Sequence, residues 1–322
     1  MKKRILSGVR PTGMLHLGNY FGALRQFVEF QSIDDNECFF FVADLHALTT
    51  KGGSDDINQA SIDIAKGFIA CGVDPAKSII YKQSDINKIP YLATILGMLT
   101  SESWLRKCTT FKEKIAKEKI VSLGLLSYPV LMTADIIIMQ TDFVPVGHDQ
   151  LQHLEMARDI TTKFNNRYGN TFKLPDVLKL KAIRVPGLDG TGKMGKSDQN
   201  YIGIFEEPSV IKKKVLACLT DQGADEGEMS QPIKNLYYLL KLCCPDDVYQ
   251  KYLGFHQQKK VRFYGELKKE LATHIIEFLT PLRVKYNSLK NDDVRDVLKI
   301  GQQKANLVAE EVFAKAFSNL KI

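Results

Sequence analysis

The sequence has 322 residues, of which 44% are hydrophobic and 25% are charged, and its formal net charge is +7 at pH 7. This composition lies in the ordinary globular range and suits one large domain or, as we prefer, two modest ones. The longest apolar runs, 38–43 and 136–139, fall far short of the roughly 20 residues that cross a bilayer. Ser7-Gly8 interrupts the apolar stretch behind the basic start, so we expect no secretion signal and a cytoplasmic protein. The positive charge favours a polyanionic partner, although many basic proteins never bind nucleic acid.

The cysteines form no Cys-x-x-Cys pair and have no His-rich partner segment. We therefore expect free thiols and neither a zinc site nor an iron–sulfur cluster. The six residues are Cys38, Cys71, Cys108, Cys218, Cys243 and Cys244.

The first 82 residues alternate between strand and helix patterns. Residues 4–9 are predicted as a strand, 17–30 as a helix with apolar residues at helical spacing, and 37–43 as a strand buried on both faces. A helix over 55–71 and a strand over 78–82 follow. This alternation predicts an α/β fold with a Rossmann-like, doubly wound parallel sheet, whose ligands bind at the carboxyl ends of the strands.

After about residue 204 the pattern becomes helical and rich in lysine. The predicted helices span 211–219, 233–243, 260–279 and 294–317. We therefore divide the chain into a Rossmann-like domain over 1–203 and an α-helical C-terminal domain over 204–322. The lysine runs 212–214 and 259–260 suit either solvent-exposed helix faces or contacts with RNA.

The first strand-to-helix turn, 7–19, has the composition of a phosphate site. Its three glycines let a ligand approach the backbone closely. The amino terminus of the following helix offers unpaired N–H groups and the positive end of the helix dipole. His16 and Asn19 are three residues apart, so both side chains can point at one anion. Taken alone, His16 also fits a surface or capping residue.

A second glycine-rich segment, 187–197, carries two lysines that can swing onto a triphosphate. Residues 190–197 also satisfy the G-x-x-x-x-G-K-S pattern of a P-loop, which makes a P-loop ATPase an alternative. A P-loop needs a hydrophobic strand before it and a helix directly after it. Pro186 precedes this segment at short range and residues 198–204 lack helical periodicity, which argues against that alternative.

Together the two segments resemble the signatures of class I aminoacyl-tRNA synthetases. His16-Leu17-Gly18-Asn19 is similar to their His-Ile-Gly-His element, and Lys193-Met194-Gly195-Lys196-Ser197 is similar to Lys-Met-Ser-Lys-Ser. Their order and location agree with the family. Asn19 replaces the second histidine, as is common among the tryptophanyl enzymes. Gly195 replaces the middle serine and gives the loop more conformational freedom.

Over nearly its full length, the chain resembles the tryptophanyl-tRNA synthetases. The most specific stretch is 142–153, which is similar to the ATP-side segment of that family, with His148 at a position that is often acidic. Other similar segments are 43–49, 110–114, 128–129, 265–286 and 301–313.

One acidic residue suggests how an amino acid would be recognised. Asp135 lies in the apolar stretch 131–139, where burying a carboxylate is costly unless a partner is supplied. The indole of tryptophan has one N–H donor, which Asp135 would accept. Phenylalanine would leave Asp135 without that partner, so the pocket would reject it. Without the resemblance, a helix-surface or salt-bridged aspartate is the simpler interpretation.

The resemblance also implies the reaction. The carboxylate of L-tryptophan would attack the α-phosphorus of ATP, which gives tryptophanyl-AMP and pyrophosphate, and the amino acid would then pass to tRNA(Trp). Catalysis would consist of positioning and charge neutralisation, with Mg²⁺ bound to ATP and no dedicated metal site on the protein. Residues 1–203 would bind ATP and tryptophan, residues 204–322 would bind tRNA and its anticodon, and the protein would be a homodimer.

Site residues are carried over from the family onto the matching positions. Those assigned to catalysis are Lys193, Lys196, Lys114, His16 and Asn19. Those assigned to ATP are Arg10, Pro11, Thr12, Gly18, Asn19, Gly147, His148, Asp149, Val185, Lys193, Met194, Gly195, Lys196 and Ser197. Those assigned to tryptophan are Asp135, Leu6, His46, Tyr128, Met132, Val144, Val146 and Gln150. Arg10 stands where many relatives have glutamine, and its extra charge could strengthen ATP binding or partly replace Mg²⁺.

Two further alternatives remain. A tyrosyl-tRNA synthetase shares the fold and both signatures but needs polar partners for a phenol, whereas the candidate pocket offers mainly apolar neighbours around one carboxylate. A non-catalytic RNA-binding relative is also conceivable, but the presence of both Lys193 and Lys196 argues against it.

Overall fold

The computed structural model describes residues 2–49, 56–115, 121–147, 150–179, 183–190, 192–196, 198–220, 229–258 and 263–321, without the side chains of Lys114 and Lys179. The protein divides into two compact units. Unit 1 combines residues 1–13, 26–182 and 290–322, and unit 2 combines residues 14–25 and 183–289.

Unit 1 is built on a parallel sheet that has five strands among the described residues. The strands are β1 (Lys3–Val9), β2 (Asn36–Val42), β3 (Ser78–Lys82), β4 (Phe143–Val146) and β5 (Asp176–Lys179), in the order β3-β2-β1-β4-β5. The β1–β2 register runs from Lys3 opposite Asn36 to Val9 opposite Val42. Because β2 and β3 lie on one side of β1 and β4 and β5 on the other, the sheet has the strand-order reversal at which doubly wound folds bind ligands. The predicted α/β fold is confirmed.

The residues of β2 explain why this sheet is covered on both faces. The run 38–42 is buried throughout. Phe40 stacks on Phe27 of α2 (Arg25–Gln31), with 4.2 Å between ring centroids. The neighbouring Phe39 and Phe41 instead join a core that includes residues of α8 (Leu123–Ile138) and α9 (Leu151–Tyr168). Alternate side chains of one strand therefore enter two different helix layers, and each buried ring contributes about 1.5–3 kcal/mol.

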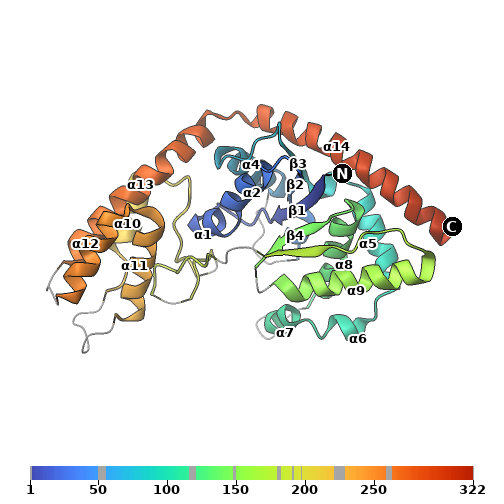
Figure 1. Ribbon diagram of the computed structural model, residues 1–322, viewed down its shortest axis with the longest axis horizontal. Coiled ribbons are helices and arrows are strands. Elements are labelled where there is room, and N and C mark those ends of the chain that lie inside the picture. Colours follow the sequence, from blue (N-terminus) through green and yellow to red (C-terminus); the bar gives the residue numbers. More distant parts are fainter. Residues whose placement is uncertain are drawn as a thin grey trace. The chain divides into compact units, whose positions relative to one another are not determined.

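Helices complete both layers of unit 1. In Figure 1, α2 and α4 (Ile57–Ala70) lie on one side of the strands, and α8 and α9 lie on the other. α8 packs against both α9 and α5. The remaining elements of unit 1 before residue 290 are α3 (Asp44–Ala47), η2 (Gln83–Asp85), α5 (Lys88–Met98), α6 (Glu102–Leu105) and α7 (Thr109–Ile115).

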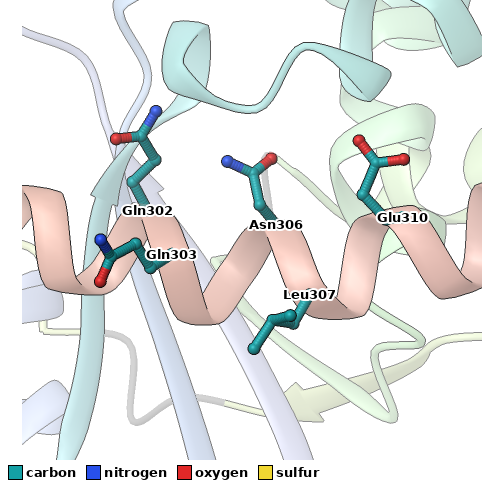
Figure 2. Close-up of a pocket in the computed structure, with 5 residues that line it drawn as sticks. All are labelled: Gln302, Gln303, Asn306, Leu307 and Glu310. Atoms are coloured by element: carbon teal, nitrogen blue, oxygen red, sulfur yellow. The ribbon is translucent and has the colours of Figure 1, made fainter.

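The last helix, α14 (Asn291–Leu320), belongs to unit 1 and packs on β3. Its closest approach is at Gly301, where an added Cβ would lie 1.8 Å from the backbone oxygen of Ile80. Nearby, the side chains of Gln302 and Asn306 each donate to the backbone oxygen of Asp85 at 3.3 Å. Figure 2 shows these two side chains projecting from the same side of α14. An open pocket of about 430 Å³ on this helix is lined by Gln302, Gln303, Asn306, Leu307 and Glu310, none of which is a predicted site residue.

The secondary-structure elements in the described residues of unit 2 are helices. Its elements are α1 (Leu17–Asn19), the π-helical turn η1 (Tyr20–Leu24), α10 (Pro208–Leu216), α11 (Gln231–Cys243), α12 (Asp246–Gln257) and α13 (Tyr264–Ser288). α10 and α11 both pack on α13. Phe21 stacks on Phe278 with 5.7 Å between ring centroids, which holds η1 against α13.

Two features differ from the sequence expectation. The helix predicted over 17–30 is divided into α1, η1 and α2, and the chain leaves unit 2 for unit 1 after Arg25. The two units also do not follow the predicted ranges 1–203 and 204–322, because α14 packs on the sheet and residues 14–25 and 183–203 join the helices. Helical periodicity shows that a segment is a helix, but not which body it packs against. Among the described helices, none is long and apolar enough to cross a membrane.

Candidate active site

The first signature forms a short, tightly held helix start in unit 2. His16 precedes α1 in an extended conformation, and its backbone N–H donates to Asn19 Oδ1 at 3.1 Å. The backbone N–H of Leu17 donates to Ile202 O at 3.0 Å, so the segment that follows the lysine loop fixes this helix start. At Gly18, an added Cβ would lie 2.9 Å from both Nδ1 and Cε1 of His16. A side chain at residue 18 would therefore displace the His16 ring.

His16 is buried beside two positive charges. Its ring is 5.7 Å from the ring of Tyr201, and its Nδ1 is buried without a hydrogen-bond partner. Burial, and after it the charges of Lys196 and Lys193, lowers the pKa of His16 to about 4. The ring is therefore uncharged at pH 7. The structure thus brings the two sequence signatures together, as predicted, with an unsatisfied buried nitrogen next to two ammonium groups.

The second signature lies on a turn whose two sides pair with each other. Pro186 and Lys193 form an antiparallel bridge, and the N–H of Met194 donates to Val185 O at 2.9 Å. Val185 and Met194 are buried, whereas Lys193 is exposed and Lys196 half-buried. Gly195 has room for a side chain, because the atom nearest to an added Cβ is Asp198 Oδ2 at 3.7 Å. The serine of the family pattern would fit there.

Asn200 links several parts of this loop by hydrogen bonds, and the sequence analysis did not identify it. It is 4% exposed, and its Oδ1 accepts the N–H of Gly195 at 2.8 Å. Its Nδ2 donates to Asp189 Oδ1 at 3.0 Å and to Lys193 O at 3.4 Å. An added Cβ at Gly187 would lie 2.1 Å from the same Nδ2. The signal in the sequence was an asparagine three residues after the motif, but periodicity alone does not reveal which backbone groups a side chain will satisfy.

We expect Asn200→Ala to slow the tryptophan-dependent ATP–pyrophosphate exchange that the resemblance implies by about tenfold, because it removes the hydrogen bonds that hold Lys193 and Gly195 in place. The KM for tryptophan should change little. The matched control is Gln199→Asn, since Gln199 is exposed and has a positive φ of 51°, which asparagine tolerates. An equal loss of exchange in both variants would show that the loop does not depend on Asn200.

Asp135 lies in unit 1, within α8, and is 1% exposed. Both of its carboxylate oxygens accept from Gln83 Nε2, at 2.8 and 2.9 Å, and its Oδ2 is 2.9 Å from His46 Nε2. Burial raises the pKa of Asp135, and the hydrogen bonds from His46 and Gln83 partly oppose that rise. The amide oxygen of Gln83 in turn accepts the N–H of His46 at 3.3 Å. Sequence reasoning named Asp135 and His46 but missed Gln83, which comes from η2, far away in the chain.

The apolar residues that were predicted to enclose the indole ring belong to one hydrophobic core. The same core includes Ala134, the neighbour of Asp135. Leu6, Val144 and Val146 are buried, and Met132 packs against them half-buried. A carboxylate can accept about four hydrogen bonds, so Asp135 keeps acceptor capacity beyond its present partners. The Asp135 carboxylate can therefore accept a hydrogen bond from one more N–H donor, in a site surrounded by apolar side chains.

A polar cluster adjoins this core. His153 is 2% exposed, its Nε2 is 2.5 Å from the hydroxyl of Tyr128, and its Nδ1 is 2.8 Å from Gln150 Oε1. Cys108 Sγ lies 3.4 Å from the same Nε2 and 3.5 Å from the Tyr128 hydroxyl. Burial alone would raise the pKa of the Cys108 thiol, but hydrogen bonds with His153, Tyr128 and the backbone of Phe111 outweigh that effect and lower the pKa to about 7. All six cysteines are free, as the sequence predicted.

The remaining predicted ATP residues of unit 1 follow the ends of two neighbouring strands. Arg10, Pro11 and Thr12 come directly after β1, and Gly147 comes directly after β4. Arg10 is exposed and Pro11 is buried. The predicted residues His148, Asp149 and Ser197, and the side chain of Lys114, lie outside the described residues.

The P-loop alternative is wrong. Within the described parts of residues 183–207 there is no helix, and α10 begins only at Pro208. The segment before the lysines pairs with the loop itself and is not a strand of the sheet. Without a helix directly after the glycines, the backbone N–H groups of a P-loop have no frame to point at phosphates.

Comparisons with known proteins indicate the family of this chain. The family model described as tRNA synthetases class I (W and Y) matches residues 1–280. The chain is 40% identical to the Tryptophan--tRNA ligase of Porphyromonas gingivalis over 319 residues, 97% of both chains. It is 39% identical to that of Caldanaerobacter subterraneus over 320 residues, 96% of this chain and 95% of the relative. Among solved structures it is similar to tryptophanyl-tRNA synthetase from Campylobacter jejuni complexed with ADP and tryptophane, with a TM-score of 0.88, 37% identity, and coverage of 99% of this chain and 100% of that one.

Proposed function

Because the chain belongs to the tryptophanyl-tRNA synthetases of class I, we propose which of its residues carry the reaction. The protein is an ATP-dependent aminoacyl-tRNA ligase that activates tryptophan and charges tRNA. The observation on which the residue assignment rests most is the buried carboxylate of Asp135, held by Gln83 and His46 inside an apolar core.

Tryptophan is bound in unit 1 by this carboxylate. The indole N–H donates to Asp135, while Leu6, Met132, Val144 and Val146 enclose the ring. His46 and Gln83 hold the carboxylate in one orientation, so little reorganisation is needed when the indole arrives. Tyr128 and Gln150 are the polar residues left to contact the charged end of the amino acid.

The triphosphate of ATP is bound by the two signatures of unit 2. The unpartnered Nδ1 of His16 suits a phosphate oxygen, and so do the ammonium groups of Lys193 and Lys196, whose charges already act on His16. Gly18 and Asn19 complete this anion site at a helix start. The match to the family assigns further nucleotide contacts in each unit. In unit 1 these are Arg10, Pro11, Thr12, Gly147, His148 and Asp149, with Lys114 as a third cation. In unit 2 they are Val185, Met194, Gly195 and Ser197.

In the first step the tryptophan carboxylate attacks the α-phosphorus in line and pyrophosphate leaves. The second step transfers the tryptophanyl group to the terminal ribose of tRNA(Trp). No protein nucleophile is required, so the side chains act by positioning both substrates and by stabilising the charge that develops on the phosphates. Mg²⁺, when bound to ATP, supplies further neutralisation of the phosphate charge. A homodimer, a cytoplasmic location and tRNA binding by residues 204–322 remain predictions from the family.

Amino-acid-dependent ATP–pyrophosphate exchange, measured with each of the proteinogenic amino acids in turn, tests this proposal. We expect exchange with tryptophan and none above background with phenylalanine. Exchange driven by tyrosine instead would overturn the assignment of Asp135 to an indole and favour a phenol-binding pocket. ATP hydrolysis without any amino acid would contradict the adenylate reaction itself.

We predict that the charge of Arg10 contributes to ATP binding. Arg10→Gln should weaken ATP binding, and the loss should be larger without Mg²⁺ than with it, because the arginine then supplies charge that the ion otherwise provides. Isothermal titration of ATP into both proteins, with Mg²⁺ and with a chelator, measures this directly. Equal affinities under all four conditions would remove Arg10 from the nucleotide site.

A further inference from the structure

His153 joins two residues of the proposed tryptophan pocket that lie on different elements. It is in the first turn of α9, and Gln150 directly precedes that helix, whereas Tyr128 is in α8. The imidazole lies between them, with Nδ1 2.8 Å from Gln150 Oε1 and Nε2 2.5 Å from the Tyr128 hydroxyl. It is 2% exposed, whereas Tyr128 and Gln150 are half-buried. His153 therefore lies behind two side chains that solvent or a ligand can reach.

The hydrogen-bond partners of His153 determine what those side chains offer. Gln150 Oε1 can only accept, so the uncharged ring carries its hydrogen on Nδ1 and its lone pair on Nε2. The hydroxyl of Tyr128 then donates to Nε2 at 2.5 Å, which is nearer than its other neighbour, Cys108 Sγ, at 3.5 Å. As a result, Tyr128 turns its hydrogen toward His153 and its oxygen toward donors, of which Thr110 is one and the ligand can be a second. Gln150 is likewise held through its oxygen, which has a second lone pair.

Oxygens held in this way suit a cation. In the proposed function, the indole N–H of tryptophan binds Asp135 and its carboxylate attacks the α-phosphorus of ATP. Its ammonium group still needs hydrogen-bond acceptors. An ammonium group has three donors and no acceptor. A Tyr128 hydroxyl that pointed its hydrogen outward would repel it.

We propose that His153 is a positioning residue that orients the oxygens of Tyr128 and Gln150 toward the ammonium group of tryptophan. This inference rests on the proposed function, because it takes Tyr128 and Gln150 as tryptophan contacts. His153 does not touch the substrate. It acts by fixing the direction of one hydroxyl and one amide.

Two ligands separate this role from a merely structural one. L-tryptophan has the ammonium group, and indole-3-propionate has the same ring and a carboxylate without it. In His153→Asn, the shorter amide keeps a donor for Gln150 but cannot reach Tyr128. We expect the Kd and KM for tryptophan to rise about tenfold, the Kd for indole-3-propionate to change less than about twofold, and the KM for ATP to stay at the parental value.

His153→Gln places an amide oxygen near the position of Nε2, so it can again accept from Tyr128. We expect this variant to recover most of the tryptophan affinity. The matched control is His274→Asn in α13, where the histidine pairs with Glu277. It should change neither Kd. If His153→Asn does not fold, His153→Gln compared with Tyr128→Phe on the same two ligands gives the same test, with only Tyr128→Phe selectively weakening tryptophan.

An equal loss of affinity for both ligands would overturn the inference and leave His153 as a packing residue. Unchanged tryptophan affinity in His153→Asn would also overturn it. The proposed function fails separately, and earlier, if the parental protein shows no tryptophan-dependent exchange. Parental exchange with tryptophan, combined with variants that do not distinguish the two ligands, would refute only the role of His153.

Discussion

Replacing Asp135 by asparagine should lower tryptophan-dependent ATP–pyrophosphate exchange by about tenfold to a hundredfold, because hydrogen bonds to charged groups contribute about 1.5–3 kcal/mol. Asparagine keeps the shape of the side chain but has only one acceptor oxygen. At present, both oxygens of Asp135 accept from Gln83 and one lies 2.9 Å from His46. In the variant, the amide NH₂ must face either His46 or the indole N–H, and two donors then meet. The loss should appear in kcat/KM for tryptophan, with KM for ATP unchanged.

A substrate analogue makes this prediction specific. In β-(3-benzothienyl)alanine a sulfur replaces the indole N–H, so the parental protein should activate it poorly. Asp135→Asn should lose little further activity toward the analogue, because the contact that the substitution removes is already missing. The exposed Asp176→Asn in β5 serves as the control acid. If Asp135→Asn lost as much activity toward the analogue as toward tryptophan, Asp135 would support the fold of α8 and would not bind the indole N–H.

The sequence predicted those parts of the fold and site that depend on residues close to one another in the chain. The alternation of strands and helices over 4–82 predicted the parallel sheet, because a run such as 38–42 can be buried only between two helix layers. The apolar stretch 131–139 singled out Asp135 as a carboxylate that needs partners if it is buried, and only the resemblance to the family made it the candidate for the indole. His16 and the lysines of the second signature were found through local spacing, and the structure places them near one another.

Residues that act across long sequence distances escaped this reasoning. Gln83 reaches Asp135 from 52 positions away in the sequence, and His153 meets Tyr128 from 25 positions away. Their amide and imidazole groups have no pattern of their own, because a polar residue next to a buried one also fits a solvent-exposed turn. The placement of α14 on the sheet was missed for a related reason. Its periodicity shows a buried face but does not identify β3 as the partner.

That placement explains the second large effect, expected for Gly301→Ala. Alanine is normally favoured over glycine in a helix by about 1 kcal/mol. Here the added Cβ would lie 1.8 Å from the backbone oxygen of Ile80, so α14 or β3 must move. We expect a net loss of about 2–3 kcal/mol in the free energy of unfolding of unit 1, and a melting temperature about 5–10 °C lower. Thermal and urea unfolding measure it.

Two glycines with open surroundings provide matched controls. An added Cβ would meet nothing within 4 Å at Gly97 in α5 or at Gly254 in α12. Gly97→Ala and Gly254→Ala should therefore raise stability by about 0.5–1 kcal/mol, through lower backbone entropy in the unfolded chain. If Gly301→Ala were as stable as these two variants, α14 would not be packed against β3 as closely as the structure indicates.

The same substitution should also reach the tryptophan pocket. Ile80 lies three residues before Gln83, and the oxygen of Asp85, at the end of η2, accepts from both Gln302 and Asn306 of α14. Moving α14 away from β3 disturbs both ends of the segment that holds Gln83 against Asp135. Below its melting temperature, Gly301→Ala should therefore show a raised KM for tryptophan with an unchanged KM for ATP. An unchanged KM for tryptophan in a destabilised variant would show that Gln83 is positioned independently of α14.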